Sequence, residues 1–169
     1  VPMMLAPGER AVWTGSAVMS KVAMAVIGLA MLLTLGAAVL VWFTGDATAG
    51  LVVAVVFVVV AAASVTSTAF HVRIDEEGLT VRSEFGLPKF NVPLADIASA
   101  EEIFVSPMGM FGGWGMRWAP GRFGVVLRTG PAIEVTRHSG KQFVVTVDDA
   151  ETGASLLAAL AARAAQNAN

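Results

Sequence analysis

The sequence predicts a membrane-spanning α-helical hairpin, followed by a mainly β domain and a C-terminal amphipathic helix. Two long apolar stretches without charge come first, an alternation of apolar and polar residues follows, and helical periodicity returns at the end of the chain. Of the 169 residues, 56% are hydrophobic and only 14% are charged. A soluble domain of this size could not bury so much apolar surface, so we expect lipid to solvate part of the chain.

The two apolar stretches, residues 22–43 and 50–70, are predicted to cross the membrane. At about 1.5 Å per residue, each helix would span a hydrocarbon core of about 30 Å. The short polar link between them requires the two helices to be antiparallel neighbours. Aromatic residues, which favour interfacial depths, lie near the ends of both stretches: Trp13, Trp42, Phe43 and Phe70.

The basic residues predict the orientation of the hairpin. Lys and Arg remain preferentially on the cytoplasmic side, and the link between the helices carries only Asp46 as a charged residue. The basic residues that flank the hairpin are Arg10, Lys21, Arg73, Arg82 and Lys89. We therefore expect both termini and the β domain to be cytoplasmic. The composition, rich in Ala, Val and Gly with more Arg than Lys, indicates a bacterial cell membrane.

An alternative interpretation of the first stretch is a cleavable signal peptide, because residues 47–49 resemble a signal-peptidase site. The stretch is longer than the roughly 7–15 apolar residues of a signal peptide, and a second stretch follows at once. We therefore favour a two-pass hairpin, residues 22–70. It separates an N-terminal cytoplasmic segment, residues 1–21, from a cytoplasmic β domain, residues 71–169, which is expected to fold alone.

Neither apolar stretch contains Asp, Glu, Lys, Arg or His. Ion and proton pathways normally need such groups, so we do not expect a transporter or channel formed by this chain alone. Small residues recur at helical spacing: Ala30, Thr34 and Ala38 in the first stretch, and Ala62 and Thr66 in the second. They either pack the hairpin against itself or dock another membrane subunit.

The alternating segments predict about seven short antiparallel strands, arranged as a sandwich or barrel. They are residues 70–75, 79–83, 90–94, 96–106, 123–127, 133–137 and 143–147. Asp148 and Glu151 resemble a capping box at the start of a final helix. This helix would close an open end of the barrel with its apolar face. The side chains on that face are Leu156, Leu157, Leu160, Ala161 and Ala164.

Several short motifs resemble those of bacterial membrane proteins with a pleckstrin-homology-like (PH-like) domain, of an actinobacterial type. They are residues 7–10 with Trp13 and Gly15, residues 93–97, and residues 112–117 with 144–149. The resemblance implies a PH-like barrel with a binding role and no enzymatic activity. Eukaryotic pleckstrin-homology domains that bind phosphoinositides carry basic residues around their first β-hairpin. The corresponding turn here, residues 75–77, is acidic, so phosphoinositide binding is not expected.

No residue pattern in the sequence predicts catalysis. His71 and His138 lack acidic or histidine neighbours at metal-ligand spacing, so neither a metal nor a cofactor is expected. Glu101 and Glu102 are adjacent, so on a strand they would point to opposite faces. The chain has no Cys, and its net charge of −2 argues against a nucleic-acid partner.

The segment of residues 108–124, rich in glycine and aromatic residues, is the candidate interaction loop. Its candidate residues are Phe111, Trp114, Arg117, Trp118 and Arg122. Such a loop either dips into the lipid interface or folds over the β domain. We expect Trp114 to pack against the domain and Arg117 to donate hydrogen bonds to carbonyl groups of the turn.

These observations favour a membrane-anchored, non-enzymatic binding module. Its expected partner is a protein, which could itself be an integral membrane protein, or the adjacent lipid bilayer. The alternative is an accessory subunit of a larger membrane protein complex, docked through its transmembrane helices.

Overall fold

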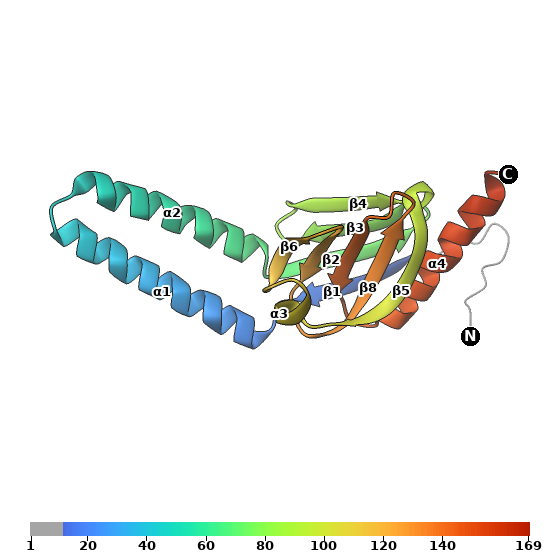
Figure 1. The fold of residues 1–169 in the computed structure, drawn as a ribbon, viewed down its shortest axis with the longest axis horizontal. Helices are drawn as coiled ribbons and strands as arrows, with labels where there is room; N and C mark the ends of the chain where they lie inside the picture. The colour runs from blue at the N-terminus through green and yellow to red at the C-terminus, as the bar shows by residue number, and fades with distance from the viewer. Residues whose placement is uncertain (1–11) are drawn as a thin grey trace.

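The computed structural model describes residues 12–169. Two long helices extend side by side from one end of a β domain, whose C-terminal helix lies at the opposite end (Figure 1). The motif of residues 7–10, with the basic residue Arg10, lies outside the described residues.

The apolar hairpin consists of α1 (Lys21–Phe43) and α2 (Ala47–Thr66). The Ser20 hydroxyl accepts a hydrogen bond from the backbone N–H of Ala23 at the start of α1. Asp46 accepts one from Ala49 at the start of α2, and such caps satisfy N–H groups that a helix leaves without partners. Both helices are long and apolar enough to cross a membrane, and almost none of their residues is buried.

The second helix ends earlier than the sequence pattern predicts. It ends at Thr66, whereas residues 50–70 were expected to span the membrane. Phe70 does not lie at the end of a helix but in β2 (Ala69–Asp75), where its side chain is fully buried in the core. The apolar run continues through this boundary because a core strand and a membrane helix require the same residue types.

A strand that the sequence analysis did not predict precedes the hairpin. Strand β1 (Trp13–Val18) pairs antiparallel with β2, from Val18 opposite Ala69 to Trp13 opposite Ile74. Trp13 therefore packs against the core of the β domain and does not lie beside the end of α1. The β domain thus includes residues on both sides of the hairpin, which is inserted between two adjacent strands of one sheet.

The β domain contains two sheets, and no closed barrel is found within the described residues. Sheet A has the order β1-β2-β3-β4, and sheet B has the order β5-β8-β9-β7-β6. The remaining strands are β3 (Gly78–Ser83), β4 (Lys89–Pro93), β5 (Ile97–Val105), β6 (Gly115–Ala119), β7 (Arg122–Val126), β8 (Gly130–Arg137) and β9 (Gln142–Thr146). The seven predicted strands are present, but β1 and β6 were missed, and β7 pairs with β9 in parallel.

The C-terminal helix α4 (Ala150–Asn167) covers the side of the sandwich where β1 and β5 are the edge strands. The predicted apolar face is confirmed, because Leu156, Leu157 and Leu160 are buried. The prediction of a capping box formed by Asp148 and Glu151 is wrong. The N-cap is Asp149, which has a left-handed backbone (φ 56°) and no side-chain cap, while Asp148 pairs with Arg128.

Two short helices complete the fold: η1 (Leu94–Asp96) before β5, and α3 (Pro107–Met110) after it. The segment that follows α3 folds over the outer face of sheet B. There Phe111 joins a small cluster that is separate from the main core. Gly124 makes room for this ring, since a Cβ atom on Gly124 would lie only 2.9 Å from the ring of Phe111.

Candidate functional site

A groove opens along the side of the β domain where β4 is the edge of sheet A. Its volume, about 500 Å³, is in the range of small-ligand and peptide-side-chain pockets. β4, the β6–β7 hairpin and the β8–β9 connection line it, with these residues: Lys89, Phe90, Asn91, Trp118, Ala119, Gly121, Arg122, Phe123, Arg137, Lys141, Gln142 and Phe143.

Aromatic rings form the apolar part of the groove. Phe90 of sheet A lies 5.0 Å from Phe123 and 6.1 Å from Phe143, both of sheet B, measured between ring centroids. The rings of Phe123 and Phe143 are 5.8 Å apart. These tilted contacts are favourable aromatic geometries and hold the two sheets together on the side that α4 does not cover.

Trp118 extends this aromatic cluster toward solvent. It lies opposite Phe123 in the β6–β7 register, and the two ring centroids are 4.7 Å apart. Nevertheless, Trp118 is 80% exposed. An exposed Trp that rests on a buried aromatic cluster offers a large, rigid apolar surface, the kind of anchor that dominates many binding interfaces.

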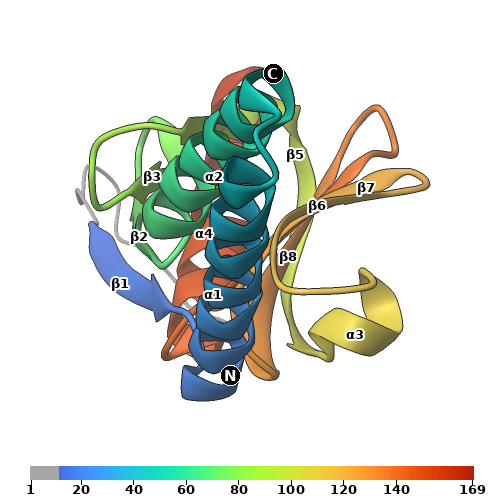
Figure 2. The same cartoon turned by 90° about the vertical axis from the view of Figure 1, so that its left-hand side faces the viewer.

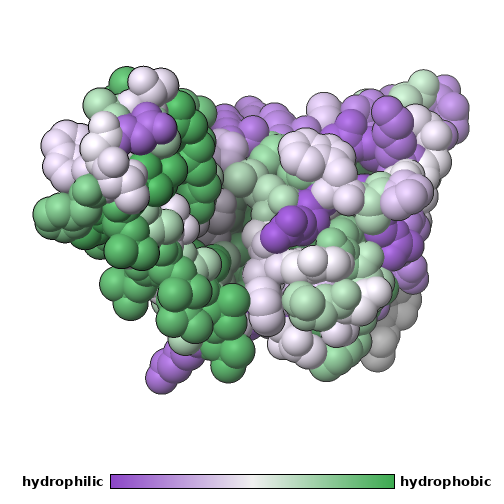
Figure 3. All heavy atoms as spheres, turned by 60° about the vertical axis from the view of Figure 1, so that its left-hand side comes forward, coloured by the Kyte–Doolittle hydropathy of each residue, from purple (hydrophilic) through white to green (hydrophobic). Residues whose placement is uncertain are grey.

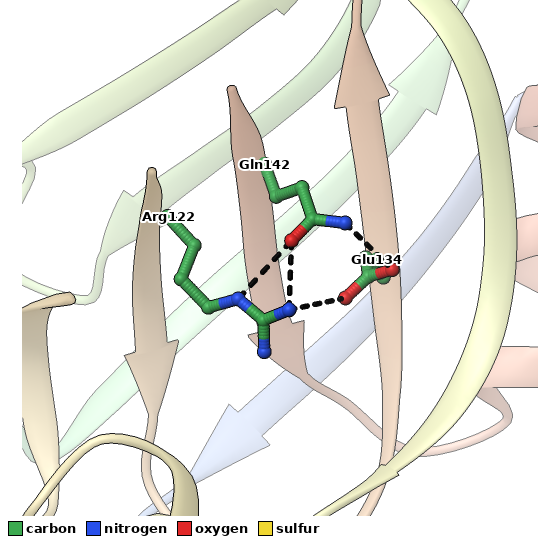
Figure 4. A network of polar contacts seen from close by, with 3 residues as sticks. All are labelled: Arg122, Glu134 and Gln142. Atoms are coloured by element: carbon green, nitrogen blue, oxygen red, sulfur yellow. Dashed lines mark hydrogen bonds and ion pairs between the residues drawn. The ribbon is translucent and has the colours of Figure 1, made fainter. Parts of the chain in front are cut away.

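Arg122 is held on the outer face of sheet B, opposite to the face that carries the rings of Phe123 and Phe143 (Figure 4). Its Nε and Nη2 donate hydrogen bonds to the Gln142 side-chain oxygen at 3.1 and 2.8 Å. Gln142 in turn donates to Glu134, and Nη2 of Arg122 lies 4.0 Å from the Glu134 carboxylate. Glu134 is almost fully buried, so this network fixes the guanidinium and balances part of its charge.

Three further cations line the groove: Lys89, Arg137 and Lys141. Within residues 12–169, none of these three side chains has an ion-pair partner, and none of the groove-lining residues is acidic. The groove therefore combines an aromatic surface with excess positive charge, although the net charge of the whole chain is −2. This arrangement suits a ligand that carries both carboxylates and apolar side chains.

The structure divides the five candidate residues of the predicted interaction loop. Trp118 and Arg122 are among the residues that line the groove, although the Arg122 guanidinium lies toward the outer face of sheet B. Phe111 is buried on that outer face. Trp114 is partly buried and packs against the main core. As predicted, Nε of Arg117 donates a hydrogen bond, 3.0 Å long, to the carbonyl of Trp114. Three of the five residues therefore shape the fold of the loop and do not line the groove.

Sequence reasoning missed the other half of the groove. Phe90 and Phe143 belong to regular alternating strands, where a buried aromatic side chain is the ordinary expectation. Lys89 and Lys141 lie in or beside turns, where an exposed cation is common. Only the pairing of β7 with β9 and the position of β4 bring these residues together.

Comparison of the chain with protein-family models, with curated proteins and with solved structures finds no match. Within the described part of the chain, no group of three or more His, Asp or Glu side chains could hold a metal ion.

Proposed function

We propose that this protein is a membrane-anchored binding module, whose aromatic and basic groove receives an acidic, apolar segment of a protein partner. The single observation that supports the binding role best is the exposed Trp118, in tilted contact with Phe123 in a groove that cations also line. No catalytic role is part of the proposal.

The hairpin supports the membrane anchor. Side chains such as Leu32, Leu40 and Val58 are more than 60% exposed, which would be unfavourable in water. Figure 3 shows a nearly continuous hydrophobic surface on the hairpin and a mixed surface on the β domain. In addition, cleavage after residue 49 would separate β1 from its partner β2, which argues against a signal peptide.

The proposed orientation places both termini and the β domain in the bacterial cytoplasm, and cysteine labelling tests it. The chain contains no Cys, so an introduced thiol is the only target. An impermeant maleimide added to intact cells should label Asp46→Cys and should not label Asn169→Cys. Labelling of position 169 alone would overturn the orientation.

An extended peptide is the ligand that fits the groove best. β4 and β6, the edge strands of the two sheets, both border it, and edge strands offer backbone groups to an added segment. Aromatic or aliphatic side chains of the peptide would pack on Trp118, and its carboxylates would meet Lys89, Arg137 and Lys141. A protein partner at the membrane could present such a segment from a cytoplasmic tail.

Membership of the PH-like group is also part of this proposal. Two packed sheets and a C-terminal helix that covers one open side support it, while the parallel pairing of β7 with β9 departs from the simple antiparallel expectation. The turn of residues 75–77, which would hold an inositide in eukaryotic relatives, is acidic, and Glu76 pairs with Arg163 of α4 at 3.2 Å. We therefore do not propose a phosphoinositide ligand.

A peptide-display screen on the full chain in lipid nanodiscs tests the groove. We expect it to enrich peptides in which Asp or Glu accompanies Phe, Trp or Leu. Binding of an enriched peptide should fall at least about tenfold in Trp118→Ala and in Lys141→Glu, as expected for an anchor and its charge partner.

The matched controls are Phe104→Ala and Arg73→Glu. Phe104 is 72% exposed, Arg73 is an exposed cation, and neither lines the groove. Equal losses in these controls would contradict the proposal. The alternative predicts a different result, in which an integral membrane partner co-purifies equally with the groove variants and with the unaltered protein. That result would replace the proposed groove binding with an accessory subunit docked through its transmembrane helices.

A further inference from the structure

The end of the β domain that meets the hairpin carries a loop with exposed apolar side chains. Residues 84–88 connect β3 to β4, and two hydrogen bonds hold the start of this loop against the base of the hairpin. The Ser83 hydroxyl donates to the carbonyl of Thr66 at 2.6 Å, and the N–H of Glu84 donates to the carbonyl of Ala69 at 3.1 Å. The loop therefore lies beside the last residue of α2.

Phe85 and Leu87 extend from this loop into solvent, with 64% and 74% of their surfaces exposed. Arg82 and Lys89 flank them on the neighbouring strands and are directly paired in the register of β3 and β4. The loop thus presents two large apolar side chains between two cations and beside one exposed carboxylate, Glu84, so its net charge is positive. This is the composition of a segment that rests at a lipid interface with anionic headgroups.

A second apolar projection lies on the other side of the hairpin. Helix α3 exposes Met108 (60%) and Met110 (36%). The N–H of Ser20, the residue before α1, donates to the carbonyl of Leu127, which places the adjoining end of sheet B at the base of α1. The end-on view of Figure 2 shows α3 and β3 on opposite sides of the hairpin.

We propose that the β3–β4 loop and α3 both rest in the headgroup layer of the membrane that holds the hairpin. Phe85, Leu87 and Met108 would contact the upper acyl chains, and Arg82 would contact anionic headgroups. This inference rests on the membrane anchor proposed above. Contact on both sides of the hairpin holds the β domain in one orientation and keeps the acidic turn of residues 75–77 away from the lipid, because β2 runs away from the hairpin.

Single-cysteine fluorescence in the full chain tests this inference. Because the chain has no Cys, an environment-sensitive dye can be attached at Phe85→Cys, Met108→Cys, Glu77→Cys or Val56→Cys. Each variant is placed in nanodiscs that carry a lipid-bound quencher either at the headgroup or in the middle of the acyl chain. Val56, in the middle of α2, reports the membrane anchor, and Glu77, in the far turn, is the exposed control. We expect the headgroup quencher to act at 85 and 108, the mid-chain quencher to act at 56, and neither to act at 77.

The outcomes separate the two proposals. Absence of quenching at 56 would overturn the membrane anchor. Quenching at 56 without quenching at 85 and 108 would overturn the interfacial contact and leave the anchor in place.

A charge variant tests the role of Arg82. Anionic lipid should increase the quenching at position 85, and Arg82→Gln should abolish this increase. Arg73→Gln should keep it, because Arg73 lies farther along β2 and pairs with Asp75 at 2.8 Å. Equal quenching in neutral and anionic nanodiscs would overturn the assignment of Arg82 to headgroups.

Discussion

The two open sides of the β sandwich differ in how they are closed. On one side α4 covers the gap, and its Leu157 and Leu160 are at most 1% exposed. On the other side the gap holds an aromatic cluster, where Trp118 remains 80% exposed among cations. Both sides bring apolar side chains from sheets A and B together, but only the first removes them fully from water. The difference indicates that the helix-covered side supplies more of the stability, and it is consistent with the proposed contact of the groove side with a partner.

Removal of β1 should have the largest effect on the helix-covered side. Trp13 of β1 lies against α4, where a Cβ atom on Gly153 would be 3.0 Å from its ring. A fragment of residues 68–169 would lose this contact and expose the edge of β2. We expect it to lack a cooperative unfolding transition and to aggregate.

A matched fragment should restore the fold. The N–H of Met19 donates to the carbonyl of Thr68 at 2.8 Å, so a short turn can join residues 12–19 to 68–169. This fragment, without the hairpin, should be a soluble monomer with dispersed NMR signals. Equal behaviour of the two fragments would show that β1 is dispensable.

Leu157→Ala should give the next largest effect. Leu157 is fully buried between α4 and the sheets, so its truncation leaves a cavity. We expect the free energy of unfolding to fall by about 2–5 kcal/mol, measured by denaturant titration of the joined fragment. Ala162→Ser, on the exposed face of the same helix, is the control and should change it by less than about 0.5 kcal/mol.

Trp114→Ala should have a smaller effect on stability. Trp114 packs against the main core but remains partly exposed. The loss should therefore lie at or just below the lower end of the range for buried aromatic side chains, about 2–3 kcal/mol. An unchanged melting curve would show that this ring does not support the β domain.

Trp118→Ala should change the stability least. Most of its ring is already in water, so truncation should lower the free energy of unfolding by less than about 1 kcal/mol. The variant should nevertheless lose peptide binding. A large fall in melting temperature would mean that the groove side, like the helix-covered side, is primarily a stabilising element.

The sequence by itself determined the elements that depend on local pattern. The presence and uniform apolarity of α1 and α2, the alternation of the seven predicted strands and the apolar face of α4 could all be predicted, because each depends on neighbouring residues only. Two of the groove residues, Trp118 and Arg122, could also be selected, because their segment has an unusual composition.

Only the tertiary structure decided how these elements combine. β1 was missed because Trp13–Val18 has a weak alternation and gains its strand structure by pairing with β2, more than fifty residues later in the chain. β6 was missed because its glycine-rich surroundings resemble a loop. The groove depends on contacts between Phe90, Phe123 and Phe143, which lie on three strands of two sheets. Such pairing is determined by the free energy of the whole fold, which no local pattern records.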